Sequence, residues 1–230
     1  MSARVVSLNV GLPRPLAHGR GEVRSGIFKS PVRGALRFGE AGLEGDGQAD
    51  TEHHGGADKA VCVYATEHLP YWQRRLGRSL EPGAFGENLS TEGLAETRVR
   101  IGDVYRVGTA LAQVSQPRIP CFKLGARHGE GKLALWVKET GLTGFYLRCV
   151  EPGEVRAGDE ILPVESAEHG FTVAEANRVM HGDGRDVAGM ERLLATPALS
   201  AEWKRMLEVR LRKATAGQED KLTGRSAQSR

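Results

Sequence analysis

The chain has 230 residues, of which 40% are hydrophobic and 27% charged, an ordinary composition for a globular protein that can bury a sizeable core. Its formal net charge of +3 is too small to indicate nucleic acid or an acidic membrane surface as a partner, and no apolar run is long enough to span a bilayer. The three cysteines, Cys62, Cys121 and Cys149, are too widely spaced for a disulfide framework or a local metal-cluster motif, so we expect a reducing, cytoplasmic location.

Residues 1–165 show the pattern of short strands separated by turns. Apolar runs predict strands at 4–10, 26–29, 35–38, 61–64, 104–107, 111–114, 145–150 and 160–164, and Gly108-Thr109 has the composition of a tight hairpin turn. Helical spacing occurs only at about 66–76 and 132–139. Many short strands with few helices favour a mainly β fold, a barrel or closely folded sheet, over alternating strands and helices.

Residues 166–213 show a helical pattern instead. Thr172 and Glu175 form a capping-box pattern that opens a helix to about Met180, a second helix is expected over 186–194, and a third starts at Ser200. These predict a small three-helix appendage, whose basic residues are more typical of a solvated helix face than of a DNA-binding surface. Residues 214–230 are polar and without periodicity, and we expect them to be disordered.

The chemistry is concentrated in residues 115–124, Ser-Gln-Pro-Arg-Ile-Pro-Cys-Phe-Lys-Leu. Pro117 and Pro120 disfavour both strand pairing and helix, which predicts a stiff, extended loop. Cations near the Cys121 thiol favour the thiolate, the form that attacks electrophiles or binds soft metals, and a guanidinium such as that of Arg118 suits phosphate. The alternative for Cys121 is a small buried hydrophobic residue, but a packing position does not need a rigid, polar loop around it.

Three further segments carry polar groups beside glycines. His54, Gly55, Gly56 and Lys59 can present amide donors and charge to an anion, whereas His53 and His54 point opposite ways on an extended chain and make a poor metal pair. The other two segments are residues 85–94, with Gly86, Glu87 and Asn88, and residues 26–32, with Lys29 and Ser30. Taken alone, an ordinary turn or a surface strand end explains each of these segments as well.

Together these segments resemble a known family. Gln-Pro-Arg-x-Pro-Cys-x-Lys-Leu at 116–124 is similar to the cysteine loop of MOSC domains (molybdenum cofactor sulfurase C-terminal domains), in particular the YiiM-like branch. His-Gly-Gly at 54–56, Phe-Gly-Glu-Asn-Leu at 85–89, Lys-Ser-Pro-Val at 29–32 and the helical extension match the same family in the same order. The resemblance implies a MOSC-type β-barrel over residues 1–165, with a few helices and a three-helix extension.

The resemblance also implies a molybdenum cofactor, in which Cys121 supplies a thiolate ligand to the metal and Asn88 lies close by as a second catalytic residue. His53 stands where the family more usually has an apolar residue, so no role is assigned to it. The cofactor-binding residues that the resemblance implies are His54, Lys59, Arg118, Lys123, Gly86, Glu87, Lys29, Ser30 and Gln116. Pyridoxal phosphate is not expected.

The implied activity is an oxidoreductase that converts N–OH groups to N–H with release of water, acting on hydroxylaminopurine-type bases and other hydroxylamines. The chain has neither a dinucleotide-binding glycine motif nor an iron–sulfur cysteine cluster, so electrons are expected from a separate reductase. The sequence leaves a homodimer open. Two other functions also stay open: a carrier that binds the cofactor without catalysis, and a cofactor-free thiol enzyme with Cys121 as nucleophile.

Overall fold

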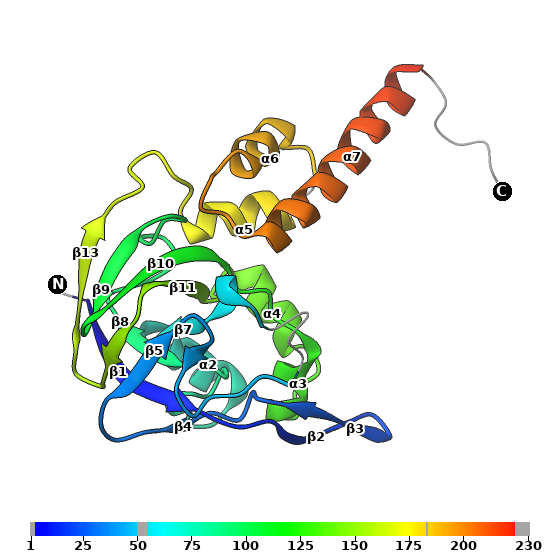
Figure 1. The fold of residues 1–230 in the computed structure, drawn as a ribbon. Helices are drawn as coiled ribbons and strands as arrows, with labels where there is room; N and C mark the ends of the chain where they lie inside the picture. The colour runs from blue at the N-terminus through cyan, green and yellow to red at the C-terminus, as the bar shows by residue number, and fades with distance from the viewer. Residues whose placement is uncertain (1–2, 50–54, 183, 224–230) are drawn as a thin grey trace.

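Seven strands close into a barrel, each pairing with the next and the last returning to the first (Figure 1). The structure, a computed structural model, describes residues 3–49, 55–182 and 184–223. Around the barrel the strands are β13 (Glu160–Glu165), β9 (Val104–Val107), β10 (Ala110–Pro117), β11 (Phe145–Glu151), β7 (Val61–Ala65), β8 (Leu89–Glu92) and β1 (Ala3–Val10). Only β7 and β8 run parallel; the other neighbours are antiparallel. The predicted barrel is confirmed.

The predicted hairpin between β9 and β10 is present, with Val107 paired to Ala110 across a two-residue loop. Gly108 has φ +58°, and a Cβ at this position would lie 2.2 Å from the carbonyl oxygen of Glu154. Because only glycine adopts this conformation without strain and leaves room for that carbonyl, the turn residue fixes the register of the two strands.

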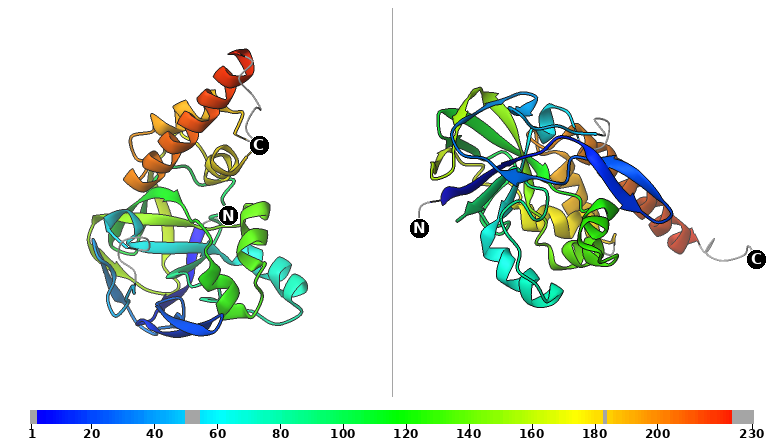
Figure 2. Two further views of the ribbon diagram at one scale, coloured as in Figure 1. Left: turned by 90° about the vertical axis from the view of Figure 1, so that its right-hand side faces the viewer. Right: turned by 90° about the horizontal axis from the view of Figure 1, so that it is seen from below.

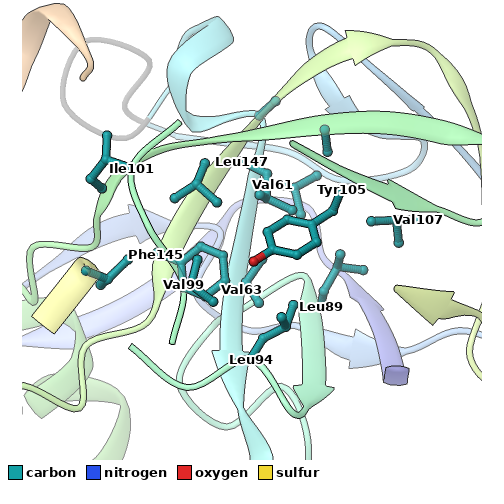
Figure 3. Close-up of a cluster of buried hydrophobic side chains, with 14 of the residues drawn as sticks. Val61, Val63, Leu89, Leu94, Val99, Ile101, Tyr105, Val107, Phe145 and Leu147 are labelled. Atoms are coloured by element: carbon teal, nitrogen blue, oxygen red, sulfur yellow. The ribbon is translucent and has the colours of Figure 1, made fainter. Parts of the chain in front are cut away.

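Alternation along the strands separates the barrel interior from a second, outward face. Val61 and Leu147 are register partners, as are Val63 and Phe145, and all four are buried in the interior (Figure 3). Burying side chains of this kind contributes about 1.5–3 kcal/mol each. The intervening residues, including Cys62 and Tyr146, therefore lie on the opposite face of the sheet.

Part of the outward face is covered by three helices, α2 (Leu69–Leu76), α3 (Phe122–His128) and α4 (Leu133–Thr140). They form a second core in which Trp72, Phe85, Leu124 and Leu133 pack with Tyr64 from β7. The Trp72 indole N–H donates to the Tyr64 hydroxyl over 2.7 Å, which in turn donates to a backbone carbonyl, so the polar tips of both rings are satisfied.

Short elements surround the rest of the barrel. β2 (Arg14–His18) and β3 (Gly21–Ser25) form a hairpin, β4 (Ser30–Pro31) pairs with β1, and β12 (Gly153–Val155), β5 (Leu36–Gly39) and β6 (Gly42–Leu43) form a small sheet. Two 3-10 helices, η1 (Ala57–Lys59) and η2 (Thr66–His68), flank β7.

The C-terminal appendage consists of α5 (Val173–His181), α6 (Val187–Leu194) and α7 (Ala201–Thr223), stacked on one side of the barrel (Figures 1 and 2). The capping box is present: the Thr172 hydroxyl accepts from the Glu175 N–H while the Glu175 carboxylate accepts from the Thr172 N–H. Buried residues of the appendage, including Met190 and Trp203, join the same apolar cluster as the barrel interior. None of the helices in the described ranges is both long and apolar enough to cross a membrane.

The structure differs from the predicted elements in several places, among them the β2–β3 hairpin, which was not predicted. Helix α7 continues to Thr223, so the expected disorder from Ala214 onward is wrong over residues 214–223. Residues 26–29 form no strand, and strand β8 and helix α3 were not predicted. Short elements of this kind are determined by the neighbours they pack against, and their own sequence pattern is weak.

Candidate functional site

Cys121 lies at the junction between strand β10 and helix α3. The expected loop over 115–124 is wrong at both ends: Pro117 is the last residue of β10 and pairs with Phe145, and α3 begins at Phe122. A proline is tolerated at a strand end, where its missing N–H removes little of the ladder. Only residues 118–121 remain as a loop, with Cys121 as the N-cap of α3.

The three cysteines differ in their surroundings. Cys121 is partly exposed, so it is not the small buried hydrophobic residue that the sequence left open, whereas Cys62 is buried. Burial raises the pKa of the Cys62 thiol, an effect that the nearby Arg118 partly offsets. Burial likewise raises the pKa of Cys149, whose sulfur lies near the Phe38 carbonyl, away from Cys121. Cys62 is therefore a protonated thiol at neutral pH, and of these two neighbouring cysteines Cys121 is the accessible one.

A hollow opens beside Cys121, and we call it the basic hollow. Four basic side chains line it, from Lys29, Lys59, Arg118 and Lys123, together with the carboxylate of Asp46. Its empty space is about 650 Å³ including the mouth, within the usual range for small-molecule sites. The excess of cations over carboxylates makes it suited to an anionic ligand.

Arg118 is the most informative of these cations. Its residue is 8% exposed, yet among the described residues its guanidinium has no hydrogen-bond acceptor. Burial lowers its pKa, but the ionisable Cys62, Tyr146 and Cys121 nearby outweigh this effect, and the pKa is raised above its ordinary value. A buried, permanently charged group without a protein partner carries a desolvation penalty, which an anionic ligand would offset.

Asp46 is a site residue that the sequence reasoning did not single out. Its carboxylate accepts from the Lys29 ammonium, from the Gly11 N–H over 2.8 Å and from the Asn88 carboxamide over 2.8 Å. The Asn88 carbonyl oxygen accepts from the Cys62 N–H over 3.0 Å. Both ends of the Asn88 side chain are thus engaged by the protein, which holds it at the wall of the basic hollow.

Helix α7 of the appendage also reaches the site. Glu202, in its first turn, forms an ion pair with Lys59 of η1. The backbone N–H of Ser200 donates to the Ser115 carbonyl of β10 over 3.1 Å. The Asp58 carboxylate, which pairs with Arg148 of β11 at 2.8 Å, accepts from the Ala201 N–H of α7 over 3.3 Å. The appendage is therefore anchored beside the cysteine, which could not be deduced from its distance along the sequence.

Tyr146 was also missed. Gln116, Tyr146 and Cys62 are register partners across β10, β11 and β7, and they form a row on the outward face of the sheet. Burial, with the ionisable Cys62 as the next cause, raises the pKa of the Tyr146 hydroxyl, so it is a phenol at neutral pH. The site thus lies on the outside of the barrel wall. The row could have been found only from the register of the three paired strands, because the three residues are far apart in the sequence.

The predicted site residues are distributed as follows. Lys29, Lys59, Gly86, Asn88, Arg118, Cys121 and Lys123 line the basic hollow together. Gln116 lines a neighbouring hollow instead, and Ser30 is exposed in β4 and lines neither. His54, like His53, lies outside the described residues.

The Glu87 carboxylate does not reach the basic hollow. It accepts from the Gly83 N–H over 2.6 Å, the Phe85 N–H over 3.0 Å and the Ser90 hydroxyl over 2.6 Å. Burial raises its pKa, although these hydrogen bonds act in the opposite direction. In this structure Glu87 holds the turn that presents Gly86 and Asn88, and a direct contact with a cofactor stays a prediction.

The residues present fit an anionic, metal-containing cofactor. Within the described ranges no three His, Cys, Asp or Glu side chains cluster in a way that could hold a metal ion. A metal at Cys121 would have ligand positions left over that a sulfur-bearing organic group could fill. Arg118 and the neighbouring lysines could bind the anionic part of such a group. Gly86, with φ +78°, leaves room for Ile27 in the wall of the hollow, because a Cβ there would lie 2.7 Å from the Ile27 side chain.

Comparisons with known proteins identify both parts of the chain. Residues 50–162 match the MOSC domain, and residues 171–214 match the YiiM-like, 3-alpha helix domain. The chain is 42% identical to Protein YiiM of Escherichia coli strain K12 over 81% of its length and 84% of that protein. It superposes on the crystal structure of YiiM from Geobacillus stearothermophilus with a TM-score of 0.78 and 37% identity, covering 91% of this chain and 99% of that one. It is also 35% identical to a Reductase of Gibberella moniliformis, over 70% of this chain but only 29% of that protein.

Proposed function

The chain belongs to the MOSC domain family, in its YiiM-like branch, and from this premise we propose that it is an oxidoreductase that uses a molybdenum cofactor to reduce N-hydroxylated compounds to amines. The family is associated with binding of that cofactor, and the relative named Reductase supports a redox role. The proposed substrates are hydroxylaminopurine-type bases and other hydroxylamines.

One observation supports the proposal more than any other: a buried guanidinium without a protein acceptor shares a hollow with an accessible thiol. Arg118 carries a charge that the described residues leave unpaired, and Cys121 offers a soft ligand in the same space. A cofactor-free thiol enzyme would need a base next to Cys121, and no histidine of the described residues lines the basic hollow.

In the proposed reaction R–NHOH, two electrons and two protons yield R–NH₂ and water. The N–O bond breaks, an N–H bond forms and the oxygen leaves as water. The cofactor supplies the two-electron chemistry when bound. Cys121 would bind the metal of the cofactor. Arg118, Lys59 and Lys123 would bind its anionic part. Asn88 and Asp46 would maintain the shape of the wall around it. The electrons would come from a separate reductase. The relative named Reductase is much longer than this chain, which matches 29% of it, so that protein has further parts outside the match.

The test is to produce the protein in a host that makes the cofactor and to compare it with Cys121→Ala. We expect the wild type to contain molybdenum and pterin and to reduce 6-hydroxylaminopurine with an artificial electron donor. The variant should lose more than about 100-fold of that activity, because Cys62, the other described thiol that lines the hollow, is buried and its pKa is raised. Cys149→Ala, at a thiol remote from the hollow, is the matched control and should keep full activity.

The rival functions give different results. Bound cofactor without turnover of any N-hydroxylated compound would identify a carrier. Activity that persists without molybdenum and disappears on alkylation of a single thiol would identify a cofactor-free thiol enzyme. Equal activity in the wild type and the Cys121 variant would overturn the assignment of the site.

A further inference from the structure

A second hollow adjoins the basic hollow on the side of the appendage. It lies between the β2–β3 hairpin, the loop that carries Cys121 and the start of α7. Its apolar walls come from Val23, Ile119, Phe122 and Met206, and we call it the apolar groove. Its empty space is about 1220 Å³ including the open mouth, enough for a bicyclic ring.

The two hollows meet at the proposed reactive centre. Cys121 and Tyr146 line both of them, as do Lys59, Ile119 and Lys123. Arg118, Lys29 and Asp46 line only the basic hollow, whereas Phe122 and Met206 line only the apolar groove. One side of the thiol thus suits an anion, and the other suits a flat, uncharged molecule.

Two polar groups of the apolar groove lack partners among the described residues. The Tyr146 hydroxyl makes no hydrogen bond with them. The Gln116 carboxamide donates to the Pro117 carbonyl over 3.3 Å, but its own oxygen has no partner although the residue is only 1% exposed. If the Gln116 carboxamide were flipped, its oxygen would lie about 3.3 Å from the Pro117 carbonyl oxygen, and two acceptors would face each other. The orientation is therefore the one described, and the group without a partner is the acceptor oxygen. A ligand that combines an N–H donor with an oxygen would satisfy both groups.

The wall formed by α7 is firmly attached. Trp203, one turn before Met206, is fully buried, and the ion pair between Glu202 and Lys59 and the bond from the Ser200 N–H to Ser115 fix the start of the helix. Met206 is half-buried and has an unbranched side chain that adapts to the shape of a neighbour. Its position makes the appendage part of the wall beside Cys121.

We propose that the apolar groove is the substrate compartment and that it selects aromatic N-hydroxylamines. The ring lies between Phe122 and Met206, and the N–OH group is directed towards Cys121, where the Tyr146 hydroxyl orients its oxygen. This inference rests on the proposed function, and it assigns Met206 as a specificity-determining residue and Tyr146 as a substrate-orienting residue.

The experiment uses Met206→Trp, with Arg205→Trp as the matched control, because Arg205 is the exposed neighbour on the same helix. The cofactor-loaded proteins are assayed with 6-hydroxylaminopurine and with hydroxylamine, which has no ring. Met206→Trp should lower the ratio of kcat/KM for the purine over that for hydroxylamine by about tenfold or more, because the added ring occupies the groove. Arg205→Trp should leave the ratio as in the wild type, and all proteins should contain equal molybdenum and pterin.

Binding of adenine, the amine product of the purine, is measured by calorimetry on the same proteins. We expect it to weaken about tenfold in Met206→Trp, and Tyr146→Phe should lower kcat for both substrates with little change in adenine binding. An unchanged substrate ratio together with unchanged adenine binding in Met206→Trp would overturn the inference. If the wild type turns over neither substrate, the proposed function fails, but a loss of adenine binding in Met206→Trp would still support the groove as a binding site.

Discussion

Two buried charged residues, Glu87 and Arg118, lie close together in this molecule, but among the described residues only Glu87 has hydrogen-bond partners for its charged group. In the turn over residues 83–90, the Glu87 carboxylate accepts three hydrogen bonds from the protein. In the basic hollow, the Arg118 guanidinium finds no acceptor among the described residues. A buried charge whose hydrogen bonds are supplied by the protein is held without a ligand, whereas one without partners is a cost to the fold that a ligand can offset. The partners of a charged residue, more than its burial, distinguish a binding residue from a structural one.

The strongest way to break this comparison is Arg118→Met, which keeps most of the side-chain volume and removes the charge. We expect cofactor retention to fall about 100-fold, because one or two charge-assisted hydrogen bonds to the anionic part of the cofactor are lost. The cofactor-free protein should be as stable as the wild type or more stable, since no protein partner is lost. Molybdenum and pterin analysis after dialysis, with urea unfolding of the cofactor-free protein, measures both quantities.

Arg106→Met, at an exposed position of β9, is the control and should change neither quantity. If Arg118→Met instead unfolded the cofactor-free protein, Arg118 would be a structural residue like Glu87, and the contrast between the two would be lost.

The converse change is Glu87→Ala. It leaves the N–H groups of Gly83 and Phe85 without their carboxylate acceptor in a buried turn. We expect a loss of about 2–3 kcal/mol in the free energy of unfolding of the cofactor-free protein. Urea unfolding checks this loss, with the exposed Glu81→Ala as control. Full stability combined with impaired cofactor retention would show that Glu87 acts on the cofactor directly.

His181 sharpens the comparison, because it is a half-buried ionisable group whose surroundings disfavour its charge. Burial, together with Lys138 and Arg210, lowers its pKa to about 4, and its Nε2 has no partner among the described residues. The folded protein therefore binds fewer protons than the unfolded chain between pH 4 and about 6.5, so stability is lost as the pH falls through this window. We expect this loss to be about 1–2 kcal/mol, after allowance for the partial exposure of the ring.

Unfolding in urea at pH 7 and pH 4.5 measures the effect. His181→Gln should reduce the difference between the two pH values, whereas the exposed His169→Gln should leave it as in the wild type. An equal difference in the wild type and in His181→Gln would show that the imidazole titrates alike in both states.

Much of the barrel could be predicted from the sequence. Elements that depend on adjacent residues were predicted correctly, whereas elements held by their neighbours in space were not. The β9–β10 hairpin and the capping box at Thr172 depend on a few adjacent residues, and both are present as predicted. The strand β8 and the helix α3 were missed because their short segments are held by contacts with β1, β7 and α4. The prolines around Cys121 misled us about the length of its loop, since a proline at the end of a strand disturbs no more than its last pair.

For the site, the sequence motifs named several residues that line the basic hollow, among them Lys29, Gly86, Asn88, Arg118 and Cys121. Motifs are local in the chain, so they could not show that Glu87 turns away from this hollow or that Asp46 connects Lys29 with Asn88. Only the tertiary structure decided that Tyr146 lies between two hollows and that α7 forms a wall of one of them. Strand register and helix docking bring together residues far apart in the chain, and no pattern within a single segment encodes those contacts.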